Sequence, residues 1–460
     1  MNLPPLRADR IVDESPIGRQ QLAVFIGAIA VLVVDGFDLQ IISYLIPAIS
    51  QEWGMAATMK GAILSAGLAG LMVGYLLLPL VAVRIGLRRM ILLSLLSMSA
   101  ATFLTLLADT PQHLVMLRFL TGLTLGGVFP NTVALITEYC PEKYRSSIVS
   151  ISYVGLPLGF LVAGWSAYAI LPQFGWRGAI AVGGILPLLA VGVVLSVIPE
   201  SLEYLLGRAK DGQQRARKII GRLFPETVLR PDAPLAVTAK KTRAANVLDL
   251  FAPKIWIGTL ALWVSLASNS VVYYFVLSWM PSMLITVGAT QQNAILAASL
   301  TNGGGILAAF ITGPLMDRYG TYPVLLGHFI VAVIFTAIVG AVLSPDLVIL
   351  VPAALCLGFC VSGLQKGISA LTVRFYSIDL RAVGLGWVFG VARLGAIAGP
   401  ILASFLFAAD WEPHTVFYVM TIPLLIGTLA VALMGYIFVL KARGAPPAVM
   451  ANQGIREMRS

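Results

Sequence analysis

Long apolar runs separated by short polar links make up most of the chain. A transmembrane helix needs about 20 apolar residues, because the hydrocarbon core is roughly 30 Å thick and a helix rises about 1.5 Å per residue. The runs of that length lie near residues 22–47, 60–82, 90–108, 113–136, 147–170, 178–198, 255–285, 290–316, 322–342, 347–373, 383–407 and 414–440. The pattern predicts an all-α integral membrane protein of twelve transmembrane helices.

The first six runs and the last six form a repeat. Arg84 follows the second run and Arg318 follows the eighth, an offset of 234 residues (318 − 84). Arg145 and Arg381 follow the fourth and tenth runs, an offset of 236 residues (381 − 145). Two offsets this close indicate duplicated halves, and a substrate site is then expected near the bilayer midplane between them.

The polar segments divide the chain into five parts. We expect a cytoplasmic tail at residues 1–20, a six-helix bundle at 21–199, a basic cytoplasmic linker at 200–253, a second six-helix bundle at 254–441 and a cytoplasmic tail at 442–460.

Composition makes lipid the solvent for most of this surface. Hydrophobic residues form 58% of the chain, charged residues form 11%, and the mean hydropathy is +0.90. Soluble domains carry about 25% charged residues. The charge available here cannot cover a water-soluble protein of this length.

The net charge of +10 reports membrane topology. Eleven Lys and Arg residues lie in 201–254, and others, such as Arg84 and Arg318, fall in links on the same side. The opposite links hold mainly acidic residues, among them Glu52 and Asp346. Basic residues concentrate on the cytoplasmic side. We therefore expect an inner-membrane protein with both termini in the cytoplasm and no nucleic-acid partner.

Enzymatic and metal chemistry find no support in the sequence. The three cysteines, Cys140, Cys356 and Cys360, form no metal signature and are expected to pack as small residues. No phosphate-binding GxxxxGK[ST] loop occurs. We expect no cofactor, no metal site and no enzyme activity.

Two aspartates inside the first predicted span are the strongest candidates for chemistry. Asp35 and Asp38 are three residues apart and share a helix face. Two neighbouring carboxylates in a medium of low dielectric do not both ionise easily, because burial and like charge oppose it. The pair is therefore a candidate proton carrier. The alternative is that one of them satisfies backbone groups near a kink at Gly36.

A lysine in the tenth predicted span is the first candidate for substrate binding. Lys366 maps through the repeat onto Asn131, so each half places a polar group at a matching depth. The lysine could hold a substrate carboxylate or be neutralised by Asp35 or Asp38, and a purely structural ion pair remains open. The further binding candidates are Gln365 beside the lysine and, in the seventh span, Asn269, Ser270, Tyr273 and Tyr274.

Two arginines also lie within predicted spans. A guanidinium stays charged, so Arg118 and Arg393 must each find a carboxylate, backbone carbonyls or an anion. We expect Arg393 to bind substrate, with a structural role as the alternative, and we group Arg118 with the gating residues.

Charged residues at helix ends are candidates for gates. Glu138 and Arg145 follow the fourth span, and Asp317 and Arg318 follow the eighth. We expect each pair to form an ion pair that breaks between two states, with Arg381 on the same side, as alternating access requires.

Seven segments identify a family resemblance. They are Asp35-Gly-Phe-Asp38, Arg118-Phe-Leu-Thr-Gly122 with Pro130-Asn131, Glu138-Tyr-Cys-Pro141 with Arg145, Pro199-Glu-Ser201, Leu277-Ser-Trp279-Met-Pro281, Arg381-Ala-Val-Gly-Leu-Gly386-Trp387 and Arg393-Leu-Gly-Ala-Ile-Ala-Gly399-Pro400. The chain resembles, over essentially its whole length, the aromatic acid:proton symporter family of the major facilitator superfamily. The resemblance implies a fold of two six-helix bundles, import of benzoate-like carboxylates with protons, and a role for Asp35 and Asp38 in transport.

One departure from the family concerns the link after the second span. The family has G-x-L-A-D-R-x-G-R-R there, whereas this chain has Pro79 and Val83 in place of the glycine and the aspartate. The missing carboxylate removes a gate partner from the N-terminal half, so gating could rely more on Asp317, or the substrate could differ.

The expected function is import of a small aromatic carboxylate by a monomer, with protons and the lipid bilayer as its other partners. Import of a non-aromatic acid is an alternative. A proton-coupled efflux antiporter usually carries a Gly-Pro pair in the fifth helix, whereas this chain has Gly155-Leu-Pro157. A receptor or scaffold without transport is disfavoured, because charges retained inside a membrane are costly.

Overall fold

The computed structural model describes residues 6–209, 211–226, 233–237, 247–253 and 255–440. The tail expected at 442–460 and part of the basic linker lie outside these residues. The elements are β1 Leu6–Arg7, α1 Ala8–Glu14, α2 Arg19–Trp53, α3 Ala57–Ile85, α4 Leu87–Leu104, η1 Thr105–Leu107, α5 Pro111–Leu125, α6 Phe129–Glu138, α7 Glu142–Ser152, α8 Gly155–Val197, α9 Leu202–Arg208, α10 Gly212–Leu223, β2 Leu235–Ala236, η2 Val247–Phe251, α11 Trp256–Thr286, α12 Gln291–Tyr319, α13 Thr321–Ala341, α14 Leu347–Phe375, α15 Ile378–Ala408, α16 Pro413–Gly435 and η3 Tyr436–Leu440.

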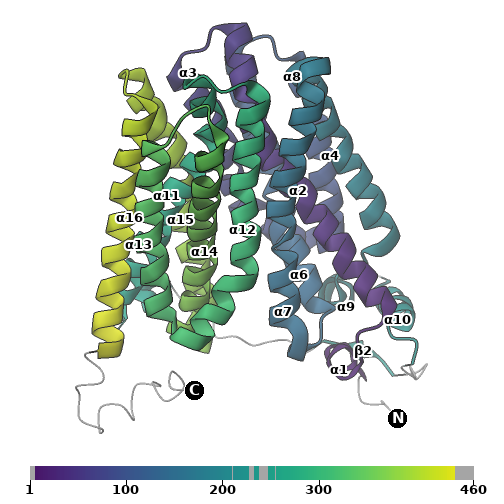
Figure 1. The fold of residues 1–460 in the computed structure, drawn as a ribbon. Helices are drawn as coiled ribbons and strands as arrows, with labels where there is room; N and C mark the ends of the chain where they lie inside the picture. The colour runs from purple at the N-terminus through teal and green to yellow at the C-terminus, as the bar shows by residue number, and fades with distance from the viewer. Residues whose placement is uncertain (1–5, 210, 227–232, 238–246, 254, 441–460) are drawn as a thin grey trace.

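Two bundles of long helices stand side by side, one built from α2–α8 and the other from α11–α16 (Figure 1). Within the described residues, eleven helical segments are long and apolar enough to cross a membrane. One of them, α8, runs for 43 residues and supplies two spans, because Gly175 in its middle has φ 64° and ψ −174°. Only glycine adopts this backbone readily, and it interrupts the helix. The twelve predicted spans are therefore confirmed in a multi-pass membrane protein.

Prolines explain two further interruptions. A proline inside a helix lacks the N–H donor and its ring clashes with the carbonyl four residues earlier. Pro130 follows the break between α5 and α6, and Pro157 follows the break between α7 and α8. The fourth span is thus assembled from α5 and α6, and the fifth begins with α7.

The internal repeat is visible in the helix boundaries. Helices α3 and α12 both have 29 residues, and their starts are 234 residues apart (291 − 57). Each is followed by a glycine with positive φ, 104° at Gly86 and 88° at Gly320. The same backbone turn at the same repeat position supports the duplication inferred from the sequence.

The linker and the N-terminal segment fold against the first bundle. Helices α1, α9 and α10 lie together below it in Figure 1, and β1 pairs with β2 in parallel, with Leu6 opposite Leu235. The last described helix, α16, also ends on this side. The basic linker and both described ends of the chain therefore share one end of the molecule, called the linker end below.

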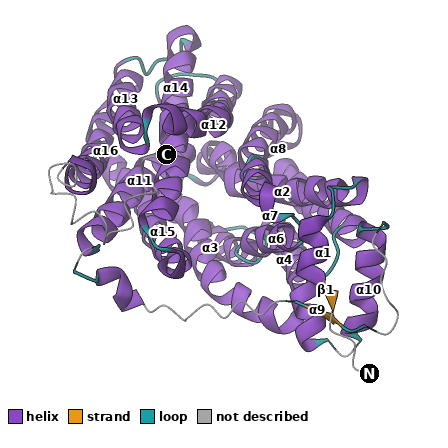
Figure 2. Cartoon of the chain, turned by 90° about the horizontal axis from the view of Figure 1, so that it is seen from below, coloured by secondary structure: helices purple, strands orange, loops and turns teal. Residues whose placement is uncertain are grey.

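The two halves meet along three helix pairs. Helix α3 packs against α15, α8 against α12 and α2 against α11 (Figure 2). Ser65 donates a hydrogen bond to the Ile397 carbonyl at 3.3 Å, and Gln40 donates one to the Leu277 carbonyl at 3.0 Å. Both halves therefore contribute polar groups to the interface between them.

Candidate functional site

Helix α2 carries both aspartates into the protein interior, and each is 0% exposed. Gly36 lies between them at the crossing with α8, where an added Cβ would come within 2.3 Å of the Leu156 carbonyl oxygen. A larger residue would push the two helices apart. The tight crossing fixes the depth and direction of the two aspartates, and Gly36 itself lies inside an unbroken α2.

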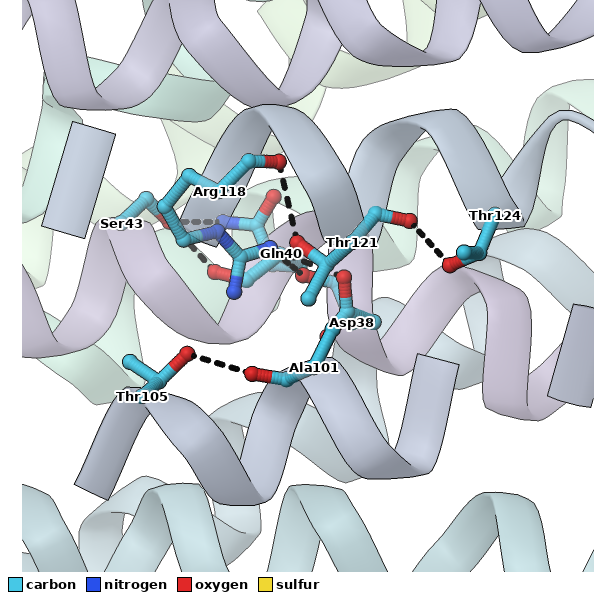
Figure 3. A network of polar contacts seen from close by, with 8 residues as sticks. All are labelled: Asp38, Gln40, Ser43, Ala101, Thr105, Arg118, Thr121 and Thr124. Atoms are coloured by element: carbon cyan, nitrogen blue, oxygen red, sulfur yellow. Dashed lines mark hydrogen bonds and ion pairs between the residues drawn. The ribbon is translucent and has the colours of Figure 1, made fainter. Parts of the chain in front are cut away.

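Asp38 forms a buried ion pair with Arg118 of α5. The Arg118 Nη2 lies 2.8 Å from Asp38 Oδ2 and also donates to the Asp38 backbone carbonyl at 3.1 Å (Figure 3). Both side chains are almost fully buried, at 3% and 0% exposure. Arg118, which the sequence analysis grouped with the gates, thus lies in the interior of the N-terminal half and ties α5 to α2.

Asp35 has no such partner. Neither of its carboxyl oxygens accepts a hydrogen bond from the described residues. The charges that act on it are the repulsive carboxylate of Asp38 and the attractive guanidinium of Arg393. Because Arg393 belongs to α15, this attraction crosses from one half of the protein to the other.

Arg393 lies between two tyrosines from opposite halves. Its Nη1 donates to the hydroxyl of Tyr274 on α11 at 2.8 Å. Its guanidinium carbon lies 4.8 Å from the ring centroid of Tyr75 on α3 and 6.0 Å from that of Tyr274. A guanidinium within about 6 Å of an aromatic face is attracted by it. The arginine is held by aromatic contacts without being neutralised by a hydrogen-bonded carboxylate.

Further aromatic rings extend this group in both directions. The ring of Phe129 lies 6.4 Å from Tyr75 and 5.3 Å from Tyr153, and Tyr273 lies 5.2 Å from Tyr274. We call Tyr75, Phe129, Tyr153, Tyr273, Tyr274 and Arg393 the aromatic row. Tyr273 and Tyr274 were candidates from the sequence, whereas Tyr75, Phe129 and Tyr153 were not, because aromatic side chains in apolar runs look like ordinary lipid-facing residues.

The other binding candidates form a polar group inside the C-terminal half. Lys366 Nζ donates to the Gly305 carbonyl at 2.7 Å, Gln365 donates to Ser270 at 3.0 Å, and Asn269 donates to the Val361 carbonyl at 3.0 Å. The alternative in which Asp35 or Asp38 neutralises Lys366 is wrong for this structure.

A cavity of only about 10 Å³ at the interface adjoins this polar group. Its described lining residues are Pro157 and Phe160 from α8, together with Tyr273, Val276, Leu277, Thr301, Asn302, Gly305, Gly358, Val361 and Ser362 from the C-terminal half. Because the cavity includes both Tyr273 and Gly305, it lies between the aromatic row and the carbonyl that holds Lys366.

Asn131, the repeat counterpart of Lys366, is engaged locally. Its Nδ2 donates to the Gly127 carbonyl at 2.7 Å, and the side chain is 2% exposed. Gly127 lies in the break before Pro130, where the regular helix bonds are interrupted. The amide therefore stabilises the junction of α5 and α6.

The ion pair expected between Glu138 and Arg145 is not formed. Glu138 instead accepts hydrogen bonds from the Ser201 hydroxyl at 2.7 Å and the Leu202 backbone N–H at 2.8 Å. Arg145 pairs with Asp13 of α1 at 3.7 Å. A carboxylate at the start of α9 accepts from N–H groups that have no partner within the helix. This explains why Glu138 contacts α9 and does not pair with Arg145.

The second expected gate pair also has different partners. Asp317 forms its ion pair with Arg374 of α14 at 2.8 Å, and Arg318 lies over the Tyr319 ring at 5.2 Å. Arg381 is half-buried near the start of α15, and its Nε finds no acceptor among the described residues. In both halves the acidic residue predicted for a gate binds a different helix from the one expected.

Glu200 of the Pro199-Glu-Ser201 segment makes the polar contacts of the turn between α3 and α4. Val83, which stands where the family has the loop aspartate, is 54% exposed. The Glu200 Oε1 accepts from the backbone N–H groups of Arg88 at 2.9 Å and Ser201 at 3.0 Å. A Cβ on Gly86 would lie 2.7 Å from Glu200 Oε2. A carboxylate from the linker thus closes the turn between α3 and α4.

Tyr139 secures the same region from α6. Its hydroxyl donates to the Glu200 carbonyl at 2.5 Å, and its own carbonyl accepts from Gln21 at 3.1 Å. Burial raises the pKa of the Tyr139 hydroxyl well above its usual range, so the group stays a hydrogen-bond donor.

Comparisons with known proteins agree with this architecture. The model of the Major Facilitator Superfamily matches residues 28–305 and 262–457. The chain is 31% identical to the 4-hydroxybenzoate transporter PcaK of Acinetobacter baylyi, over 93% of each chain. It is 29% identical to a gallate transporter of Pseudomonas putida, over 94% of this chain and 96% of that one. Among solved structures, a D-xylose-proton symporter aligns with a TM-score of 0.68 at 17% identity, covering 91% of this chain and 97% of that one.

The Asp38–Arg118 pair predicts a specific stability pattern. Asp38→Asn or Arg118→Gln alone leaves one buried charge unpaired, so each should lower the free energy of unfolding by about 3–5 kcal/mol. The double variant removes both charges and should recover much of that loss. Melting temperatures of the detergent-solubilised protein test this.

The control is to neutralise the exposed pair Glu52–Arg177, whose side chains are 45% and 43% exposed. This change should alter the free energy of unfolding by only about 0–1 kcal/mol. If the double variant is no more stable than the less stable of the two single variants, Asp38 and Arg118 do not form a stabilising buried pair.

Proposed function

The chain belongs to the Major Facilitator Superfamily and is a membrane transporter, and we propose that it imports a small aromatic carboxylate of the benzoate or hydroxybenzoate type together with protons. The observation that carries the proposal is the position of Arg393, which lies between aromatic rings of both halves and within the field of Asp35. A site shared by the two halves can respond when they move relative to one another.

The aromatic row suits both ends of such a substrate. A guanidinium binds a carboxylate through two parallel hydrogen bonds, and among the described residues Arg393 donates a hydrogen bond only from its Nη1, to Tyr274. The rings of Tyr75, Phe129 and Tyr273 offer faces and edges against which a benzoate ring can pack. The names of the relatives support the class, since 4-hydroxybenzoate and gallate are both hydroxylated benzoates.

Asp35 is the proton carrier in this proposal. Its carboxylate is buried without a hydrogen-bond donor among the described residues, so the ionised form depends on Arg393 for stabilisation. Asp38 is held by Arg118 and contributes its charge to the coupling by repelling a negative charge on Asp35. The two aspartates of one helix face therefore have different roles.

Charge balance couples the two ions. In the empty site the charges of Arg393 and Asp35 offset each other. When a substrate carboxylate binds Arg393, Asp35 loses its counter-charge and takes a proton, so the loaded site is again neutral. A buried site with an unbalanced charge is costly. Both the empty and the loaded site can therefore change access, with one proton moving per acid.

Polar contacts at the linker end form the gate in this proposal. The contacts of Glu138 with α9, of Arg145 with α1 and of Asp317 with α14 join helices at that end, and Arg318 and Arg381 lie near it. Following the positive-inside rule, the linker end faces the cytoplasm and the protein resides in the inner membrane. The polar side chains next to the cavity beside the aromatic row, which help to shape it in this proposal, are those of Lys366, Gln365 and Asn269.

Helix packing at the opposite end closes that side. An added Cβ on Gly61 of α3 would lie 2.3 Å from the Ser404 Cβ on α15. Contacts this close allow two helices to seal together and to separate as rigid bodies when access switches.

Replacing Asp35 tests the proton step. Asp35→Asn keeps the side-chain shape but cannot release a proton, so uptake of labelled 4-hydroxybenzoate into proteoliposomes under an inward proton gradient should fall to the level of empty liposomes. Exchange of labelled for unlabelled substrate, which needs no net proton movement, should persist.

The control for this experiment is Asp410→Asn. Asp410 is exposed and has φ 57°, a conformation that asparagine also adopts. It should transport as the unmodified protein does. Gradient-driven accumulation that survives in Asp35→Asn would contradict the proton role. If aliphatic acids accumulate and aromatic acids do not, the aromatic assignment is wrong.

Replacing Arg393 tests substrate binding. Charge-assisted hydrogen bonds contribute about 1.5–3 kcal/mol, so Arg393→Gln should raise the half-saturating substrate concentration by about tenfold or more. Tyr274→Phe removes only the hydrogen bond that orients the guanidinium and should have a smaller effect. Arg177→Gln, an exposed arginine remote from the site, is the control. Equal half-saturation in Arg393→Gln and Arg177→Gln would remove Arg393 from the site.

A further inference from the structure

A second cavity, of about 240 Å³, lies at the linker end and is unrelated to the aromatic row. It is open to the surface and is lined by the start of α4, the end of α8 and the amphipathic helix α10. Its described lining residues are Arg88, Leu195, Ser196, Val197, Ile198, Pro199, Glu200, Arg215, Lys218, Ile219, Arg222 and Leu223. Its volume is several times the ~30 Å³ that one water molecule occupies in the liquid.

Helix α10 directs its basic residues into this cavity. Arg215, Lys218 and Arg222 are three and four positions apart, so they share one helix face. The residues that anchor the helix on another face, all buried, are Ala216, Ile220 and Leu223. The spacing that packs α10 against the bundle therefore also lines up three positive charges.

Positive charge in the cavity exceeds negative charge. Four cationic side chains line it, and Glu200 is the one carboxylate among its described lining residues. One Glu200 oxygen already accepts two backbone N–H groups. Arg88 is attracted by Glu200 and repelled by both Arg215 and Arg222. A bound anion would relieve this repulsion.

Arg88 retains donor capacity inside the cavity wall. Its Nη2 donates to the Leu195 carbonyl at 2.8 Å and the Val194 carbonyl at 3.4 Å, which fixes the guanidinium at the end of α8. Its buried Nε has no acceptor among the described residues. The two carbonyl contacts hold the positive charge of Arg88 at the cavity wall.

The cavity lies at the boundary between the hydrocarbon core and water. Arg88 is the second residue of the third span, and Leu195 lies in the last turn of the sixth. Leu195 is 57% exposed, so its apolar side chain belongs to the lipid-facing surface. Apolar wall residues on one side and cations on the other match a molecule with an acyl chain and an anionic headgroup.

We propose that this cavity binds the phosphate of an anionic phospholipid, with Arg88, Arg215, Lys218 and Arg222 around the headgroup and Leu195 and Ile219 against its acyl region. A free phosphate offers the same anion chemistry, but it makes no use of the apolar wall. Basic cavities at the cytoplasmic membrane surface recognise anionic lipid headgroups in this way.

The test is retention of phosphatidylglycerol by the full-length protein, measured by native mass spectrometry after transfer from detergent micelles containing that lipid or phosphatidylcholine. The variant Arg215→Gln/Lys218→Gln/Arg222→Gln should weaken phosphatidylglycerol binding by about tenfold or more. Arg84→Gln/Lys143→Gln/Arg208→Gln removes the same charge from exposed positions at the linker end that do not line the cavity, and it should bind as the unmodified protein does. Arg215→Lys/Arg222→Lys keeps the charge and should retain the lipid.

Several results would overturn the proposal. Equal losses in the two triple variants would mean diffuse attraction by surface charge. Equal retention of phosphatidylglycerol and phosphatidylcholine would remove the anionic requirement. Displacement of phosphatidylglycerol by millimolar inorganic phosphate would assign the cavity to a free anion. Loss of lipid in the charge-retaining variant would indicate a disturbed α10 rather than a lost headgroup site.

Discussion

A charge buried in a membrane protein needs a partner, and this constraint organises the centre of the molecule. Water is absent at that depth, so an unpaired ion is costly. Asp38 and Arg118 meet the requirement within one half through a 2.8 Å ion pair. Asp35 and Arg393 meet it only across the two halves and without a hydrogen bond between them. In the proposed mechanism the first pair stays fixed, whereas the second exchanges its partner for a substrate anion and a proton.

Close helix packing makes the central arrangement possible. Gly36 lets α2 approach α8 so closely that both aspartates are removed from solvent. Gly61 allows a similar approach of α3 and α15 at the end opposite the linker. Small residues permit such contacts between helices in lipid. Structure near the site therefore depends as much on the absence of side chains at these crossings as on the charges themselves.

The span count, the duplicated halves and the depth of the charged residues were predictable from the sequence. Span length follows from bilayer thickness, and the repeat preserved even the positive-φ glycines at Gly86 and Gly320. Asp35, Asp38 and Arg393 were identifiable because a charged residue inside an apolar run is rare. These features are set by properties that each segment carries on its own.

Partner choice could not be predicted, because it depends on which helices meet. Lys366 donates to the Gly305 carbonyl, Glu138 accepts from the start of α9, and Glu200 accepts from the Arg88 backbone N–H. Tyr75 gave no signal in the sequence, and its place beside Arg393 follows from the contact of α3 with α15. The sequence therefore locates the charges, and the packing decides what each one does.

In the proposed mechanism, substrate binding at Arg393 makes Asp35 take up a proton. The most direct measurement is the number of protons bound when the purified protein binds 4-hydroxybenzoate, obtained by calorimetric titration in buffers of different ionisation enthalpy. At a pH high enough to ionise Asp35 in the empty site, the unmodified protein should take up close to one proton per acid, and Asp35→Asn should take up none. Binding without proton uptake by the unmodified protein, or undiminished uptake by Asp35→Asn, would contradict it.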